Sequence, residues 1–424
     1  MSYSKIMNTY QSTIKDTLKN RFLGYVKTWT TSDLEKADNG IMPSTQTQTE
    51  FAKKLAQELQ DIGIKDVTVT KYSYVCARIP CSIGAETVPS VGFLAHMDTA
   101  MDVSGKNVKP NIVEKYQGQK ITLKEGVVLD PKTDKYLAEA TGETLITTDG
   151  TTLLGADDKA GIAEIITAVE FILKNKLPHG QIELLFSPDE ETGHGMDKVP
   201  LDWIESKQCY TLDGGHIGEL EVECFSAWKS DISFTGISIH TGSARPKLVN
   251  AVTMCSEFLN LLPKNEAPET TDGYQGFYAP LNVSGHIEEA TCTVLLRDFT
   301  NTGIEEKKQT IDILARAIEC KYKGSKVTVK HTQQYLNMKE ELDKVPAVQE
   351  ALTAATKAIG IQPTYLPIRG GTDGSRLTEM GIPTPNIFTG GHNYHSRQEW
   401  ASLEQMCAAS QIVVELVKIW SLAN

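Results

Sequence analysis

The sequence predicts an α/β protein in which a smaller α+β domain interrupts a larger one. The length of 424 residues exceeds what one compact core usually holds, so two domains are expected. Before about residue 224, short apolar runs alternate with amphipathic segments, as strands and helices do in an open α/β sheet. The segments that follow have the strand-helix-strand-strand-helix-strand order of a ferredoxin-like domain.

The first elements show clear hydrophobic periodicity. Apolar residues at helical spacing predict helices at residues 14–26 and 44–63. Thr47 or Thr49 is the expected cap of the second helix. Residues 67–70 alternate between apolar and polar side chains, which predicts a half-buried strand.

Two buried strands come next, with a helix between them. Residues 91–95 and 181–186 are short apolar runs, and residues 161–174 are amphipathic. Each strand ends at polar residues, and sheets of this kind bind ligands beyond the carboxyl ends of their strands. These strand ends are therefore the expected position of a functional site.

The rest of the chain predicts the inserted domain and the completion of the larger one. Strands are expected at residues 230–234, 290–296 and 326–330, and helices at residues 248–262, 304–320, 345–359 and 407–422. We therefore predict a larger domain of residues 1–224 and 338–424 and an inserted domain of residues 225–337.

Composition excludes several classes of function. Hydrophobic residues make up 40% and charged residues 23%, as in an ordinary globular enzyme. The net charge of -12, without a Lys/Arg-rich run, argues against a nucleic-acid partner. No apolar run reaches the roughly 20 residues of a membrane span, and no signal peptide is evident, so a cytoplasmic protein without a membrane partner is expected. The 8 scattered cysteines suggest reduced, mostly buried thiols.

Five separated segments carry carboxylates or imidazoles where apolar runs end. They are His96-Met97-Asp98, Asp157-Asp158-Lys159, Glu190-Glu191, Asp213-Gly214-Gly215 and His395. Together they could hold two divalent metal ions with a bridging carboxylate and leave one acid for proton transfer. A metal pair with a spare base is typical of hydrolases.

Each segment also has a simpler interpretation. His96 could cap a strand, although Asp98, two residues on, could instead orient a metal-bound imidazole. Asp157 could merely cap a helix. Glu190-Glu191 could be a solvated loop, or a ligand beside a general base. Because His392, His194 and His216 lie near the same loops, spacing alone does not decide which imidazoles bind metal.

The segments resemble the ordered signatures of the co-catalytic zinc exopeptidases, the clan of glutamate carboxypeptidase and aminoacylase. The matching stretches are residues 96–99 (HMDT), 155–161 (GADDKAG), 187–193 (SPDEETG) and 210–215 (YTLDGG). Within the clan, the resemblance is to the peptidase T family of tripeptide aminopeptidases. It is carried by residues 43–45 (PST), 368–374 (IRGGTDG) and 385–391 (PNIFTGG) and by Tyr394-His395. It covers nearly the whole chain from about Phe22.

The resemblance implies a zinc-exopeptidase-like catalytic domain, with a mixed central sheet flanked by helices and a ferredoxin-like lid domain. It implies two zinc ions, which cobalt or manganese could replace. The implied metal ligands are His96 and Asp213 for one ion, Glu191 and His395 for the other, and Asp157 as the bridge. The implied catalytic residues are Asp98, which orients His96, and Glu190, the general base. His392, His194 and His216 fall outside this set.

The inserted domain would add further residues. Residues 238–244 (SIHTGSA) resemble the family's lid motif, whose histidine, here His240, helps to stabilise the tetrahedral oxyanion. Thr241 stands where the common pattern has proline. Arg297, Arg369 and Asn393 are candidates for binding the polar ends of a peptide, since an arginine fork matches a terminal carboxylate.

The implied function is that of a metal-dependent aminopeptidase that releases the N-terminal residue from tripeptides. Small peptides would be its partners, and it would be a monomer or homodimer. One alternative is another hydrolase of the clan, such as a dipeptidase, a carboxypeptidase or an N-acyl amino acid amidohydrolase. A second alternative is a non-catalytic binding protein, which should lack one or more ligand positions, yet all are present.

Overall fold

A computed structural model describes residue 7, residues 9–83 and residues 88–423. The chain divides into two compact units. Unit 1 comprises the described residues up to Val222, Glu341–Leu366 and the described residues from Thr372 onward, and unit 2 comprises Glu223–Glu340 and Pro367–Gly371. The short segment Pro367–Gly371, which contains Arg369, thus groups with unit 2 rather than with the larger predicted domain.

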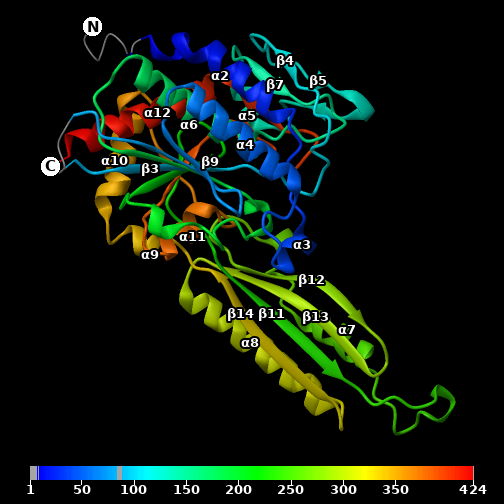
Figure 1. Cartoon of the computed structure of the whole chain (residues 1–424). Helices are drawn as coiled ribbons and strands as arrows, with labels where there is room; N and C mark the ends of the chain where they lie inside the picture. Colours follow the sequence, from blue (N-terminus) through cyan, green and yellow to red (C-terminus); the bar gives the residue numbers. More distant parts are fainter. Residues whose placement is uncertain (1–6, 8, 84–87, 424) are drawn as a thin grey trace. The chain divides into compact units, whose positions relative to one another are not determined.

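Unit 1 is built on an eight-stranded mixed sheet of order β1-β2-β8-β3-β9-β16-β10-β15 (Figure 1). The strands are β1 (Asp66–Val69), β2 (Val75–Ile79), β3 (Val91–His96), β8 (Ile182–Ser187), β9 (Cys209–Gly214), β10 (Glu219–Glu221), β15 (Thr364–Tyr365) and β16 (Asn386–Phe388). The four central strands β8, β3, β9 and β16 run parallel, and β1, β2 and β10 add antiparallel pairs. The predicted fold class, α/β with a mixed central sheet, is confirmed.

Both faces of the central strands are buried, which explains their continuous apolar sequences. Phe93 and Phe186 contribute to the large core on one face, whereas their neighbours Leu94 and Leu185 contribute to a smaller core on the other. The larger core also contains residues of α2 (Tyr10–Val26), α4 (Gln46–Asp61), α6 (Ala156–Lys174), α10 (Pro346–Ala358) and α12 (Leu403–Leu422). The smaller core includes Leu377 of α11 (Asp373–Glu379).

The start of α4 differs from the prediction. The helix begins after Thr45, so the predicted caps Thr47 and Thr49 lie inside it and that prediction was wrong. The reason is a buried contact from far along the chain. Asp189 accepts hydrogen bonds from the backbone N–H of Ser44 and from the Gln48 side chain, which fixes the chain just before the helix begins.

A second, four-stranded sheet of unit 1 has the order β17-β18-β7-β4. Its strands are β4 (Asn111–Val113), β7 (Leu145–Thr147), β17 (Gly391–His392) and β18 (Trp400–Ser402). A two-stranded sheet joins β5 (Ile121–Thr122) and β6 (Val128–Leu129), and the short helices α3 (Leu34–Asp38) and α5 (Lys135–Glu139) lie in the same unit. Because β18 pairs with β7, the loop that contains His395 lies beside the chain that leads to Asp157.

Unit 2 has an antiparallel sheet of order β12-β13-β11-β14, whose core includes residues of two helices (Figure 1). Its elements are β11 (Ser226–Thr235), α7 (Ala251–Leu261), β12 (Phe277–Gly285), β13 (Glu289–Asp298), α8 (Asn301–Lys321) and β14 (Lys326–Tyr335). This is the predicted strand-helix-strand-strand-helix-strand order. The individual position of β12 was not predicted from the sequence.

Among the described residues, no helix has both the length and the apolar character that crossing a bilayer requires. No disulfide joins the eight cysteines, all of which lie in the described part of the chain; six are buried, Cys81 is partly exposed and Cys320 is exposed.

Candidate metal centre

The five predicted segments meet at the carboxyl edge of the central sheet of unit 1. β3 ends at His96, β8 leads into a turn at Glu190–Thr192, β9 contains Asp213, β16 leads towards His395, and α6 begins beside Asp157. Parallel strands bring their carboxyl ends to one edge, so residues far apart in sequence become neighbours there.

The Asp157 carboxylate lies between two imidazoles. Its Oδ1 is 2.8 Å from Nε2 of His96, and its Oδ2 is 3.1 Å from Nε2 of His395. Two further carboxylates complete the group. Asp213 Oδ1 is 3.5 Å from His96 Nε2, and Glu191 Oε2 is 3.0 Å from His395 Nε2. The arrangement therefore has two halves that share Asp157.

The adjacent glutamates face different imidazoles. Glu191 approaches His395, whereas Glu190 Oε2 is 4.0 Å from Nε2 of His96. Glu191 Oε1 is buried and has no hydrogen-bond partner among the described atoms. A buried carboxylate oxygen without a donor is costly unless a cation or an ordered water satisfies it.

Asp98 holds the turn that carries both glutamates. Its Oδ1 and Oδ2 accept the backbone N–H groups of Glu190 and Glu191 at 3.0 and 3.1 Å. Its Oδ1 is also 3.4 Å from Nδ1 of His96, and its backbone oxygen is nearer to that nitrogen, at 3.2 Å. The buried Asp98 thus links one imidazole to the glutamate turn.

Asp158, like Asp98, is a carboxylate close to His96 whose two oxygens are already engaged by backbone N–H groups. By distance alone, two groups of three described side chains could each hold a metal ion, and one of these groups consists of His96, Asp158 and Asp213. However, Asp158 accepts the backbone N–H groups of His96 and Gly161 at 3.1 and 3.2 Å. Gly161 is required there because a side chain would come within 2.1 Å of the backbone oxygen of Leu212. Asp158 is therefore better suited to fixing the helix start than to binding an ion.

Burial opposes the charged forms of the clustered carboxylates. It raises the pKa of Glu191 to about 8, with the Asp157 charge adding to the effect, and raises the pKa of Asp213 to about 6. The pKa of Glu190 is also raised, chiefly by burial. Burial acts on Asp157 in the same direction, but its hydrogen bonds with His395 and His96 outweigh that effect and lower its pKa. Bound cations would favour the charged form of all four groups.

The donor set fits a pair of metal ions. Imidazole nitrogens and carboxylate oxygens are ligands that zinc prefers, and the open Glu191 oxygen faces no competing donor in the described structure. His96 and Asp213 would hold one ion and Glu191 and His395 the other, with Asp157 between them. These are the residues named from the sequence, and their roles as ligands remain predictions.

Unit 2 carries two other predicted site residues. His240 is exposed and precedes a short turn at Thr241–Ser243, and its Nδ1 accepts the backbone N–H of Gly242 at 3.1 Å. Arg297 donates to the backbone oxygen of Trp228 at 3.2 Å, and its guanidinium lies over the Tyr335 ring.

The last two predicted substrate-binding residues have protein partners. Arg369 donates to backbone oxygens within residues 271–275 at 2.8 to 3.3 Å and lies over the Phe277 ring. Asn393, in unit 1, donates to Asp134 at 2.9 Å. Both would have to exchange these hydrogen bonds to bind a peptide.

Three other histidines lie outside the cluster. His194 pairs with Asp197 and Asp38 at 2.7 and 3.2 Å. His216 and His392 lie in an aromatic stack, with their ring centroids 5.4 Å apart. None of the three belongs to a group that could hold an ion in the described part of the chain.

Two further carboxylates near the cluster were not predicted. Asp102, an exposed residue, has its Oδ2 3.3 Å from Nδ1 of His395. Glu399 is buried and accepts backbone N–H groups from residues 154–157. The only sequence signal for Glu399 was its position four residues after His395, before an apolar segment.

The stacked His392 makes the stability of the fold depend on pH. Burial, with the nearby His216, lowers the pKa of His392 to about 4. The neutral ring is therefore favoured on folding, and this stability is present above the unfolded pKa of about 6.5 and lost as the pH falls towards 4. Phenylalanine can still stack on Trp400 but does not titrate. When the pH is lowered from 7 to 5, we expect the free energy of unfolding of His392→Phe, measured in urea, to fall by about 2 kcal/mol less than that of wild type. Equal losses in both proteins would contradict this prediction.

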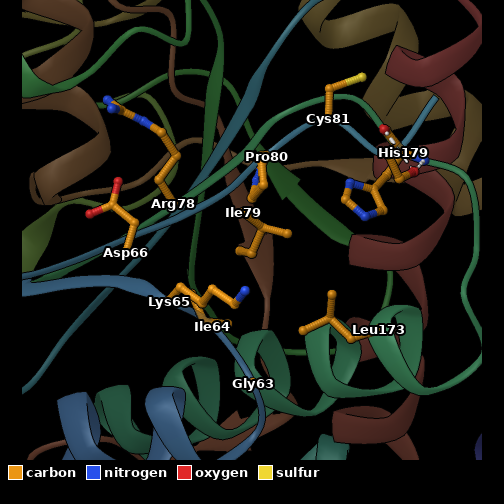
Figure 2. Close-up of a pocket in the computed structure, with 11 residues that line it drawn as sticks. Gly63, Ile64, Lys65, Asp66, Arg78, Ile79, Pro80, Cys81, Leu173 and His179 are labelled. Atoms are coloured by element: carbon orange, nitrogen blue, oxygen red, sulfur yellow. Dashed lines mark hydrogen bonds between the residues drawn. The ribbon is translucent and has the colours of Figure 1, made fainter. Parts of the chain in front are cut away.

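A separate pocket of unit 1 lies away from this cluster (Figure 2). It has a volume of about 530 Å³, and Figure 2 shows Ile79, Leu173 and His179 around it. Ile79 pairs with Ile182, where β8 begins, so the pocket lies at the opposite edge of the sheet from His96. It does not belong to the candidate metal centre.

Comparisons with known proteins show the family of this chain. The model of "Peptidase family M20/M25/M40" matches residues 147–419. A protein named peptidase T from Clostridium botulinum (strain Loch Maree / Type A3) is 47% identical over 411 residues, covering 96% of this chain and 100% of that protein. A peptidase T from Listeria welshimeri is 44% identical and covers 96% and 99% of the two chains.

Solved structures share the fold. The aminopeptidase PepT from Bacillus cereus superposes with a TM-score of 0.74 at 22% identity, covering 96% of this chain and 98% of that one. A tripeptidase from Staphylococcus aureus gives a TM-score of 0.74 at 19% identity, with 96% and 99% covered. The prediction of an enzyme that hydrolyses peptide bonds is confirmed, and the chain belongs to peptidase family M20/M25/M40.

Proposed function

We propose that the protein is a two-metal aminopeptidase that releases the N-terminal residue from tripeptides. The observation that carries the proposal is the position of the Asp157 carboxylate between the imidazoles of His96 and His395. Relatives named peptidase T, at 44 to 47% identity over nearly the whole chain, support the choice of substrate. So do structures of the same fold that are described as an aminopeptidase and a tripeptidase.

In this proposal the metal ligands are His96, Asp157, Glu191, Asp213 and His395. Two zinc ions are the proposed natural pair. When bound, the ions would polarise the scissile carbonyl and make water a stronger acid. The raised pKa of Glu191, due first to burial, supports a cation as its partner.

Glu190 is the proposed general base. Its carboxylate lies at the edge of the cluster, 4.0 Å from His96 Nε2, whereas Glu191 is closer to an imidazole. Glu190 would accept a proton from the attacking water and pass it to the departing amine. Asp98 would set the orientation of His96 and, through the backbone of Glu190, the position of the base.

Residues of unit 2 have proposed roles with the substrate. Unit 2 would be the lid domain, and His240 would stabilise the oxyanion, a role that its exposed imidazole permits. Arg297, Arg369 and Asn393 remain the proposed contacts for the polar ends of the peptide. Arg369 would bind a carboxylate only by giving up hydrogen bonds to residues 271–275. We place the enzyme in the cytoplasm, where short peptides would be its substrates.

A small substrate panel tests the function. Zinc-loaded enzyme is given Ala-Ala-Ala, Ala-Ala and N-acetyl-Ala-Ala-Ala, and the products are identified by mass. We expect rapid release of free alanine and Ala-Ala from the tripeptide and much slower cleavage of the other two. Fastest cleavage of the acetylated peptide would exclude an aminopeptidase, and fastest cleavage of Ala-Ala would indicate a dipeptidase.

A further inference from the structure

Resting on the proposed function, we propose that Glu399 is a positioning residue that fixes the loop presenting the bridging carboxylate, Asp157. Glu399 is only 1% exposed. It touches neither imidazole in the described contacts, so it would act through the backbone that carries Asp157. This gives the residue a specific task in metal binding.

The carboxylate of Glu399 accepts four consecutive backbone N–H groups. Its Oε2 accepts those of Leu154 and Gly155 at 2.6 and 2.8 Å, and its Oε1 accepts those of Ala156 and Asp157 at 2.7 and 3.3 Å. N–H groups at the start of a helix have no partner within the helix. The buried Glu399 carboxylate satisfies those of Gly155, Ala156 and Asp157 and also that of Leu154, which precedes the helix. Hydrogen bonds to a charged acceptor are stronger than neutral ones.

The same carboxylate joins two segments that supply metal ligands. Glu399 follows His395 by four residues and precedes β18, while its partners precede or begin α6. The side chains carried by these two segments, His395 and Asp157, approach within 3.1 Å. Gly155 adopts φ +82°, a conformation that favours glycine and turns the chain around the carboxylate. Fixing this loop would therefore fix the distance between two ligands.

Glu183 provides a matched control for a purely structural role. It is also buried, at 2% exposure, and its carboxylate accepts the backbone N–H groups of Glu205 and Ser206 at 2.9 to 3.2 Å, as well as a hydrogen bond from Arg78 at 3.0 Å. It lies on β8 one residue from Ile182, where the strand begins, at the edge opposite the cluster. Loss of its charge should weaken the fold without changing the ligand geometry.

The test compares Glu399→Gln, Glu183→Gln and wild type, each prepared without metal. Cobalt(II) is titrated with a competing chelator, the visible spectrum of the bound cobalt is recorded, and the melting temperature of the metal-free protein is measured. Glutamine has an NH2 group in place of one of the two acceptor oxygens of glutamate. That group would face backbone N–H groups and could not accept their hydrogen bonds. We expect both variants to melt below wild type, but only Glu399→Gln to bind cobalt 10- to 100-fold more weakly and with an altered spectrum.

A second variant keeps the test decisive if Glu399→Gln does not fold. Glu399→Asp retains the charge on a shorter side chain, and weaker cobalt binding than wild type would support the proposal. The proposal would be overturned if a folded Glu399 variant bound cobalt with the affinity and spectrum of wild type. In that case its only change would be a lowered melting temperature, as in Glu183→Gln. If wild type itself binds no cobalt, the proposed function fails instead, so the two failures can be told apart.

Discussion

Replacement of Glu190 by glutamine is expected to remove nearly all turnover while both metal ions remain bound. Glutamine keeps the size of the side chain but cannot accept a proton, and loss of a general base typically costs 10²- to 10⁴-fold in rate. Glu190 is not the carboxylate nearest an imidazole; its Oε2 is 4.0 Å from His96. Metal content is measured by mass spectrometry alongside kcat on a tripeptide, and Glu190→Ala should behave in the same way.

The neighbouring Glu191 supplies the matched comparison. Glu191→Gln removes the carboxylate that lies 3.0 Å from His395 Nε2, so it should weaken the binding of one ion as well as slow the reaction. If Glu190→Gln lost metal while Glu191→Gln kept both ions, the roles assigned to the two glutamates would have to be exchanged.

Asp157→Ala is expected to abolish activity by removing both ions at once. Each carboxylate oxygen of Asp157 faces a different imidazole, at 2.8 and 3.1 Å. Among the described residues, no other carboxylate pairs with both His96 and His395. Zinc bound per chain should fall close to zero after dialysis, and added zinc should not restore turnover.

Stability measurements separate this effect from misfolding. The Asp157→Ala protein should melt near the temperature of metal-free wild type, because α6 keeps the hydrogen bonds between Asp158 and the backbone of Gly161 and His96. Two ions still bound per chain in a folded Asp157→Ala protein would show that Asp157 is not the bridge.

The buried strands and helices were predicted well from the sequence. In a long segment, the spacing of the apolar residues indicates either a helix or a strand. The parallel strands β3 and β8 and the helices α6 and α8 are found where periodicity indicated. The strands of the second sheet in unit 1 have only two or three residues each, too few for any period. β12 was missed because Pro280 and a register shift interrupt its alternation and most of the strand is exposed.

Part of the candidate metal centre could be predicted from the order of the strands. Parallel strands bring their carboxyl ends together, so His96 and Asp213 could be expected to meet. Spacing could not choose among the histidines, and that choice came from the resemblance. The parts played by Asp189 and Glu399 depend on backbone N–H groups 145 and more than 240 residues away in sequence, which no local pattern reveals.

The most direct test of the central claim is anomalous X-ray scattering at the zinc edge from crystals of the zinc-loaded enzyme. The account predicts two zinc peaks per chain, one beside His96 and Asp213 and one beside Glu191 and His395, both in contact with Asp157. A single peak, or a pair of peaks that does not share Asp157, would contradict it.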